Sequence, residues 1–256
     1  MDEQELSRRA ERARRRLQGA RRFLFITGAG LSAESGLPTY RGTGGLYERS
    51  QEEAGMPAEE ALSGIVFEQQ PAVTWAHIGR IEAACRGAEP NLAHRIIAAL
   101  ESQFEVVVFT QNIDGLHRAA GSSTIIDIHG DCHQLLCTGC SFRESRTDYV
   151  GMPIPPHCPT CGAVMRPDVV LFGERLPMRK LEHLFRELER GFDASFSVGT
   201  SSLFPYVIEP MADAARKGSL TIEVNPDRTP VSSIVEERLE CGAVRGLSAL
   251  FPEFVP

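Results

Sequence analysis

The 256-residue sequence lacks four features, and each absence excludes a class of protein. No apolar run approaches the roughly 18 residues that a membrane-spanning helix needs, and no secretory signal segment is present. Positive charge is not in excess, since the net charge is −7, which disfavours general binding to nucleic-acid phosphates. The seven cysteines are odd in number and unlike the disulfide framework of a secreted protein. We therefore expect a cytoplasmic globular protein that binds neither membranes nor nucleic acid.

Basic residues are concentrated at the start of the chain, where residues 1–22 hold eight arginines. Acidic residues stand among them, whereas mitochondrial and chloroplast transit peptides are poor in acids. The pattern favours a solvent-facing helix with one apolar stripe over a targeting or nucleic-acid-binding segment.

Short apolar runs alternate with helical patterns along the rest of the chain. This alternation predicts an α/β fold with a parallel sheet that is covered by helices on both faces. Ligands of such sheets lie beyond the carboxyl ends of the strands. Small and polar residues gather at four predicted strand ends, which are residues 28–32, 111–117, 199–202 and 225–227.

Two Cys-x-x-Cys pairs, Cys137 with Cys140 and Cys158 with Cys161, are separated by seventeen residues. Each pair places two thiolates on one side of a metal ion, and two pairs complete the tetrahedron that zinc prefers. Four thiolates leave no coordination position for water, so the spacing predicts one structural zinc ion rather than redox pairs. The nearby Cys132 is interpreted as a bystander.

A glycine-rich loop follows the first predicted strand. Gly28 and Gly30 match the first half of a dinucleotide-binding fingerprint, but Ala33 stands where the third glycine is usual. Such a loop, taken alone, is a structural turn about as often as a nucleotide site. Asn225, at the end of a later predicted strand, is a better candidate for a ribose hydroxyl than Glu48, which no strand precedes.

Seven motifs occur together in the order found in sirtuins: GAGLSAESGLPTYRG, TQNIDGLH, IHG, the paired Cys-x-x-Cys, VVLFGE, GTSS and VNPD. Over residues 20–250 the chain resembles this family of NAD-dependent protein lysine deacylases, and a bacterial member is expected. The resemblance implies a Rossmann-like NAD-binding domain formed by residues 1–40, 94–134 and 167–256. A small domain, formed by residues 41–93 and 135–166, would combine a helical module with the four-cysteine zinc module.

The resemblance also implies roles for individual residues. His129 and Asn112 match the catalytic positions. The positions that match NAD-binding residues are Gly28, Ala29, Gly30, Ser32, Glu34, Tyr40, Arg41, Gln111, Asn112, Ile113, Asp114, Gly199, Thr200, Ser201 and Asn225. The acyl-lysine tunnel would be bordered by Val169, Val170, Leu171 and Phe172, whose backbone would pair with the substrate peptide as an added strand.

The family reaction suits these residue types. The acyl oxygen attacks the nicotinamide ribose, nicotinamide leaves, and a histidine of near-neutral pKa takes a proton from a ribose hydroxyl that attacks the intermediate. Water then completes the reaction, which yields free lysine and O-acyl-ADP-ribose. The expected partners are therefore acyl-lysine proteins or peptides; the sequence leaves the oligomeric state open and is compatible with a monomer.

The acyl preference rests on two further positions. Sirtuins that remove succinyl or malonyl groups carry a Tyr-x-x-Arg pair on a helix before a PNxAH motif, and arginine suits a carboxylate. Counting back from Pro90, the matching positions are Ala76 and Gly79, and neither binds a carboxylate; Arg80 stands one residue later and would match the arginine only in a shifted alignment. We expect a deacylase for neutral acyl groups, acetyl first, with room for longer chains.

Three alternatives stay open at this point. NAD-dependent ADP-ribosyl transfer to protein would use the same NAD pocket, and the sequence hardly separates it from deacylation. A zinc-ribbon NAD-binding module without catalysis is disfavoured by the intact His129, Asn112 and Asp114. A zinc-ribbon nucleic-acid binder is disfavoured by the net charge of −7.

Overall fold

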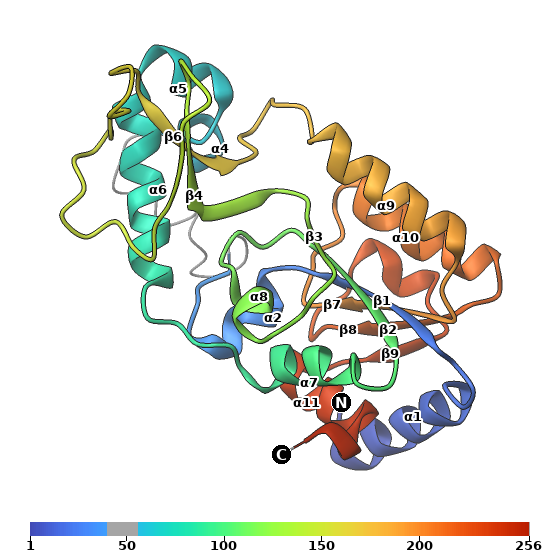
Figure 1. Ribbon diagram of the computed structural model, residues 1–256. Coiled ribbons are helices and arrows are strands. Elements are labelled where there is room, and N and C mark those ends of the chain that lie inside the picture. Colours follow the sequence, from blue (N-terminus) through green and yellow to red (C-terminus); the bar gives the residue numbers. More distant parts are fainter. Residues whose placement is uncertain (40–55, 256) are drawn as a thin grey trace.

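The structure is a computed structural model, and it describes residues 1–39 and 56–255. Its larger part is built on a six-stranded sheet with the strand order β3-β2-β1-β7-β8-β9, in which every neighbouring pair is parallel (Figure 1). This confirms the predicted α/β fold with a parallel sheet. The strands are β1 (Arg22–Thr27), β2 (Glu105–Thr110), β3 (Ile125–Asp127), β7 (Ala194–Val198), β8 (Leu220–Val224) and β9 (Glu237–Leu239).

Helices cover both faces of this sheet, as its buried strands require. Alternate residues of β1 point to opposite faces, so that Phe23 and Phe25 belong to one apolar cluster and Leu24 and Ile26 to another. The first cluster packs under α1 (Glu3–Arg16), α7 (Leu92–Leu100) and α11 (Ala243–Leu250). The second packs under α9 (Met178–Arg190) and α10 (Pro205–Arg216), at the right in Figure 1.

The strand order reverses between β1 and β7, which are neighbours in the sheet but far apart in the sequence. At this switch point the chain leaves β1 into α2 (Ala29–Ser32) and η1 (Ala33–Ser35). The Gly30 amide donates to the Gly199 carbonyl at 2.8 Å. A Cβ atom on Gly30 would lie 2.7 Å from that oxygen. Glycine is therefore required here because two loop backbones touch.

A second, three-stranded antiparallel sheet lies beside the helices of a smaller module, at the upper left in Figure 1. Trp75, fully buried on α6, donates from Nε1 to the Met165 carbonyl at 2.8 Å and joins the helices to this sheet. The small part of the fold is thus helical and cysteine-bearing, as predicted. Its elements are α4 (Ala58–Ala61), α5 (Gly64–Gln69), α6 (Pro71–Cys85), β4 (Gly130–Cys137), β5 (Arg143–Ser145) and β6 (Met165–Val169).

The exact division into domains stays a prediction. β4 and β6 both cross the predicted boundaries at residues 134–135 and 166–167, and both belong to the small sheet. The remaining short elements are α8 (Leu116–Ala119), η2 (Pro230–Ser233) and η3 (Pro252–Phe254).

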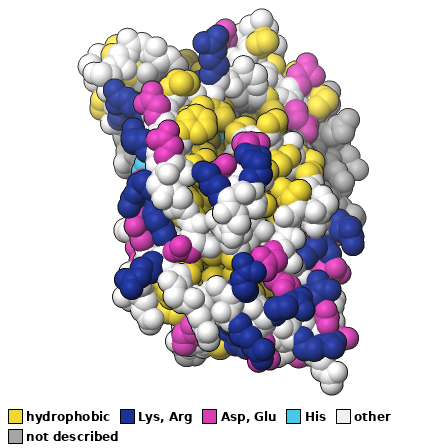
Figure 2. All heavy atoms as spheres, turned by 90° about the vertical axis from the view of Figure 1, so that its right-hand side faces the viewer, with side chains coloured by type: hydrophobic (Ala, Val, Ile, Leu, Met, Phe, Trp, Pro, Cys, Tyr) yellow, Lys and Arg dark blue, Asp and Glu magenta, His cyan; other side chains and the backbone are white. Residues whose placement is uncertain are grey.

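The arginine-rich start of the chain forms α1, whose apolar stripe is Leu6, Ala10 and Ala13. This stripe packs into the core, which confirms the predicted helix. Its basic side chains pair with acids: Arg12 donates to the Glu237 carboxylate at 2.7 Å, and Arg16 pairs with Glu236. On the face shown in Figure 2, side chains of opposite charge are interspersed over the lower part. In the described part of the chain, no helix combines the length and apolar character needed to cross a membrane.

Candidate active site and zinc site

A cavity of about 980 Å³ opens at the carboxyl ends of the large sheet, on the side that faces the small module. One part of its wall comes from the loops after β1, β2, β7 and β8, and we call this part the polar end. The other part comes from Leu62 directly after α4, from α6, and from the segment that begins at the last residue of β6, and we call it the apolar end. The polar end includes Gly28, Ala29, Gly30, Gln111, Asn112, Gly199, Thr200, Ser201 and Asn225, and the apolar end includes Leu62, Ile78, Ile81, Val169, Val170, Leu171 and Phe172.

Side-chain amides join the loops of the polar end. Asn112, buried after β2, donates from Nδ2 to the Gly28 carbonyl and to Ser32 Oγ, both at 3.1 Å. Gln111 donates to Thr200 Oγ1 at 2.7 Å. Asn225 Nδ2 donates to the Thr200 carbonyl at 2.9 Å. The loops of four strands are thereby held in one arrangement.

Ser32 and Asp114 lie behind this wall and do not line the cavity. Ser32 Oγ donates to Asp114 Oδ2 at 2.7 Å, and Asp114 Oδ1 accepts from the Leu116 amide at 2.9 Å. Burial raises the pKa of the Asp114 carboxyl, while these two hydrogen bonds oppose the rise. In this geometry the buried side chains of Ser32 and Asp114 support Asn112 from behind the wall, and their roles around NAD stay predictions.

The other predicted NAD-binding residues are placed as follows. Ala29 and Ile113 line the cavity, and so does Glu34. Glu34 Oε1 also accepts from the Val244 amide at 2.9 Å, which fastens η1 to the first turn of α11. Tyr40 and Arg41 lie outside the described residues.

His129 lies between the two ends of the cavity. Its Nδ1 is 3.0 Å from the Gln111 carbonyl oxygen, and its Nε2 is 2.7 Å from the Tyr206 hydroxyl. Its own carbonyl accepts from the Val170 amide at 2.9 Å, so the same residue joins the polar loops to the apolar segment. Burial lowers the pKa of the imidazole; the Gln111 carbonyl opposes this and the Lys180 ammonium adds to it. A neutral imidazole at this place can accept a proton.

The apolar end is formed on α6 by Ile78 and Ile81, which are three residues apart and share one helix face. The predicted positions Ala76 and Gly79 do not line the cavity, and this is a correction. Ala76 is exposed, and a Cβ atom on Gly79 would meet Ile154 instead. The count back from Pro90 is two residues off. Two residues along a helix turn the side chain by about 200°, onto another face.

The segment Val169–Phe172 borders the apolar end, and its predicted role in an acyl-lysine tunnel stays a prediction. Part of its backbone is already paired. The Phe172 amide donates to the Leu62 carbonyl at 2.9 Å, and the Phe172 carbonyl accepts from the Gly64 amide at 3.0 Å. Addition of a substrate strand to this segment stays a prediction.

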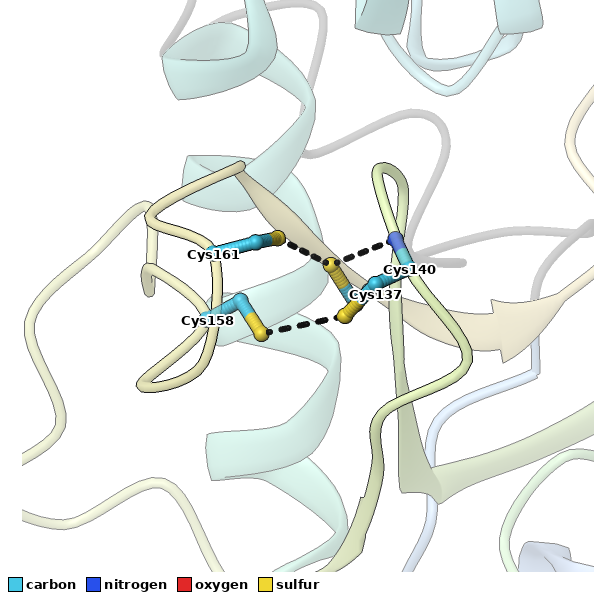
Figure 3. A group of neighbouring side chains, drawn as sticks. All are labelled: Cys137, Cys140, Cys158 and Cys161. Atoms are coloured by element: carbon cyan, nitrogen blue, oxygen red, sulfur yellow. Dashed lines mark hydrogen bonds between the residues drawn. The ribbon is translucent and has the colours of Figure 1, made fainter.

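The four cysteines of the two Cys-x-x-Cys pairs converge in the small module (Figure 3). Cys137 ends β4 and Cys140 lies in the turn after it, whereas Cys158 and Cys161 lie in the loop before β6. Their sulfur atoms all lie within 4.8 Å of one another, with 3.4 Å from Cys137 to Cys161 and 3.7 Å from Cys140 to Cys158. A tetrahedron of zinc–sulfur bonds of about 2.3 Å has edges of about 3.8 Å. Cys132 lies apart from this group, beside Asp131. The donor set therefore fits zinc.

Three residues of the cavity wall carry no motif that sequence reasoning could use. Ile78 and Ile81 look like ordinary core positions of a helix. Tyr206 follows GTSS at a distance of four residues, and only the fold brings it to His129.

The fold and the site together define a class: α/β proteins that bind a nucleotide at the switch point of a parallel sheet and carry an inserted zinc module. Comparisons with known proteins agree. The model of the Sir2 family matches residues 28–204. The chain is 45% identical over 238 residues to NAD-dependent protein deacylase 2 of Pseudomonas syringae pv. tomato, which covers 91% of this chain and 96% of the relative.

Two solved structures are also similar. A Sir2 homologue in complex with NAD superimposes with a TM-score of 0.82 at 33% identity, over 99% of this chain and 94% of that one. A Sir2 variant with a deacetylated p53 peptide and 3′-O-acetyl-ADP-ribose has a TM-score of 0.84 at 26% identity, over 96% of this chain and 99% of that one. The chain belongs to the Sir2 family.

Proposed function

We propose that this protein removes neutral acyl groups from lysine side chains of proteins and consumes NAD, with release of nicotinamide and O-acyl-ADP-ribose. One observation carries the proposal: a single cavity joins the polar end to the apolar end, with His129 between them. A dinucleotide needs hydrogen-bonding loops, and an acyl-lysine side chain needs an apolar channel. The relatives described above bear the same activity in their names and bound ligands.

The polar end is the NAD site in this proposal. Gly28 and Gly30 bring the backbone close to the co-substrate, and Gln111, Thr200 and Asn225 already orient one another around it. Asn112 acts beside His129, where its buried amide holds the loop after β1. When bound, NAD supplies the ADP-ribosyl group that receives the acyl group.

His129 is the base that takes a proton from a ribose hydroxyl. Its neutral form is favoured by burial, so the imidazole is ready to accept at neutral pH. The four cysteines hold a structural zinc ion, which takes no part in the reaction because four thiolates leave no coordination position for water.

The apolar end selects the acyl group. Ile78, Ile81 and Leu62 would have to strip water from a succinyl or malonyl carboxylate without offering it a partner, which is costly. Among the described residues that line the cavity, the arginines are Arg228, after β8, and Arg245, on α11. Arg166, near the apolar end, already pairs with Glu174 at 2.6 Å. We therefore propose acetyl and longer neutral acyl groups as substrates. The cytoplasmic location is a separate prediction from the sequence.

The test is incubation of the purified protein with NAD and an acetyl-lysine peptide, followed by mass spectrometry. We expect one nicotinamide and one O-acetyl-ADP-ribose for each lysine that is deacetylated. ADP-ribose attached to protein, with the acetyl-lysine peptide unchanged, would instead establish an ADP-ribosyltransferase. NAD binding without any product would establish a non-catalytic module.

A further inference from the structure

Both ring nitrogens of His129 have partners, and the partners define the state of the ring. The Gln111 carbonyl oxygen, 3.0 Å from Nδ1, can only accept a hydrogen bond, so Nδ1 carries the proton. In the neutral imidazole Nε2 is then unprotonated and can accept a hydrogen bond. The Tyr206 hydroxyl, 2.7 Å away, donates to it. The Tyr206 hydroxyl is thus hydrogen-bonded to Nε2, the nitrogen with which a base would accept a proton from its substrate.

The fold holds this phenol in place. Tyr206 is the second residue of α10, directly after Pro205, whose ring restricts the backbone at the start of the helix. Its ring stacks on Phe204, with centroids 5.4 Å apart and planes 10° apart. Both rings stand nearly perpendicular to the His129 imidazole, at 80° for Tyr206 and 89° for Phe204. All three residues line the cavity.

We propose that Tyr206 is a positioning residue for His129. Its hydroxyl and the Gln111 carbonyl together hold the imidazole in one orientation, with an unprotonated Nε2. The inference rests on the proposed function, since it assigns a helper to the proposed base. An imidazole with two fixed nitrogens cannot flip between its two ring orientations. An incoming ribose hydroxyl therefore meets the base in its reactive orientation and replaces, or shares, the hydrogen bond of Tyr206.

The variant that tests this is Tyr206→Phe, which keeps the ring and its stacking on Phe204 and deletes only the hydroxyl. We expect kcat to fall about 10-fold, by analogy with the 10- to 100-fold losses that follow removal of a hydrogen-bonded partner that orients a metal-bound histidine. The KM for NAD should stay within about twofold, because the hydroxyl is proposed to orient the base and not to bind the co-substrate. Tyr149→Phe is the matched control: its hydroxyl donates to the Cys132 carbonyl in the small module, so kcat should not change.

Nitrogen-15 NMR of histidine-labelled protein reports the protonation and hydrogen bonding of the two His129 ring nitrogens. If Tyr206 only packed against His129, loss of its hydroxyl would leave these resonances unchanged. In the ligand-free wild type we expect His129 with a protonated Nδ1 and a hydrogen-bonded, unprotonated Nε2. In Tyr206→Phe the Nε2 resonance should move toward that of a nitrogen without a hydrogen bond, and in Tyr149→Phe it should not move. This measurement on the wild type decides the matter even where the variant does not fold.

Two results would overturn the inference. One is a wild-type spectrum in which Nδ1 of His129 is the unprotonated nitrogen. The other is a Tyr206→Phe protein with wild-type kcat and an unmoved Nε2 resonance. Failure of the proposed function is distinguishable, because it appears as absent O-acyl-ADP-ribose in the wild type, whereas the NMR readout requires no turnover.

Discussion

The two ends of the cavity are built by different forces. At the polar end, amide side chains from Gln111, Asn112 and Asn225 join loops that are far apart in the sequence. At the apolar end, Leu62, Ile78 and Ile81 present side chains that are held by packing alone. Hydrogen bonds are directional and costly to leave unmade, whereas packing tolerates changes that keep volume. The polar end is therefore suited to one fixed co-substrate, and the apolar end to acyl groups that vary.

His129, at the junction of the two ends, should give the largest effect. Replacement by alanine removes the proposed base, and we expect kcat to fall by about 10² to 10⁴, the usual contribution of general base catalysis. NAD binding, measured by calorimetry, should persist because the loops of the polar end are untouched. His183→Ala on the surface of α9 is the control and should keep full turnover. Full turnover by His129→Ala would contradict the proposed role of His129 as the base.

Loss of the zinc site should affect the apolar end and not the polar end. Cys158→Ala breaks the four-sulfur cluster, and the small module that carries the apolar end should lose its order because metal binding supplies part of its folding energy. We expect deacylation to fall at least about 10-fold and the melting temperature to drop. Cys241→Ala, at a buried cysteine of the large part, serves as control. A metal-free Cys158→Ala protein that kept wild-type melting and turnover would refute the structural role.

A pair of glycines compares the stability of a loop contact at the polar end with that of a helix position in the small module, outside the cavity. In Gly30→Ala the new Cβ would lie 2.7 Å from the Gly199 carbonyl oxygen, so we expect a loss of about 1–3 kcal/mol and a raised KM for NAD. Gly79 lies within helix α6, and the nearest atom to a new Cβ in Gly79→Ala is Ile154 Cδ1 at 3.4 Å. We therefore expect the free energy of unfolding to rise by about 0.5–1 kcal/mol, because alanine favours the helix more than glycine does. Urea unfolding measures both. Equal effects from the two changes would contradict the close contact of the loops after β1 and β7.

The pH dependence should give the smallest effect. Burial lowers the pKa of His129 from its ordinary value of 6.5, so the neutral, basic form persists below that pH. We expect kcat/KM to stay level as the pH falls through 6.5 and to decline only below it, when the imidazole becomes protonated. A decline that began above pH 6.5 would show that the site does not favour the neutral ring.

Much of this site was predictable because its residues stand in spaced motifs. The two cysteine pairs, His129 after β3 and the loops at the strand ends follow from local patterns, and so do the main strands and helices of the large sheet. β9 and α11 escaped prediction because each is short and its burial depends on partners distant in the sequence. Ile78 and Ile81 escaped because a two-residue error along α6 selects another face. Tyr206 escaped because its role depends on a contact 77 positions away in the sequence.

The central claim is that the apolar end admits neutral acyl groups while the polar end and His129 perform one common reaction. It is tested most directly by kcat/KM of the wild-type protein, with NAD, on one peptide that carries acetyl-, hexanoyl- or succinyl-lysine. We predict that the acetyl and hexanoyl peptides are deacylated at least about 10-fold more efficiently than the succinyl peptide, because Ile78 and Ile81 leave a carboxylate without a partner. A succinyl peptide that exceeded the acetyl peptide would contradict the account.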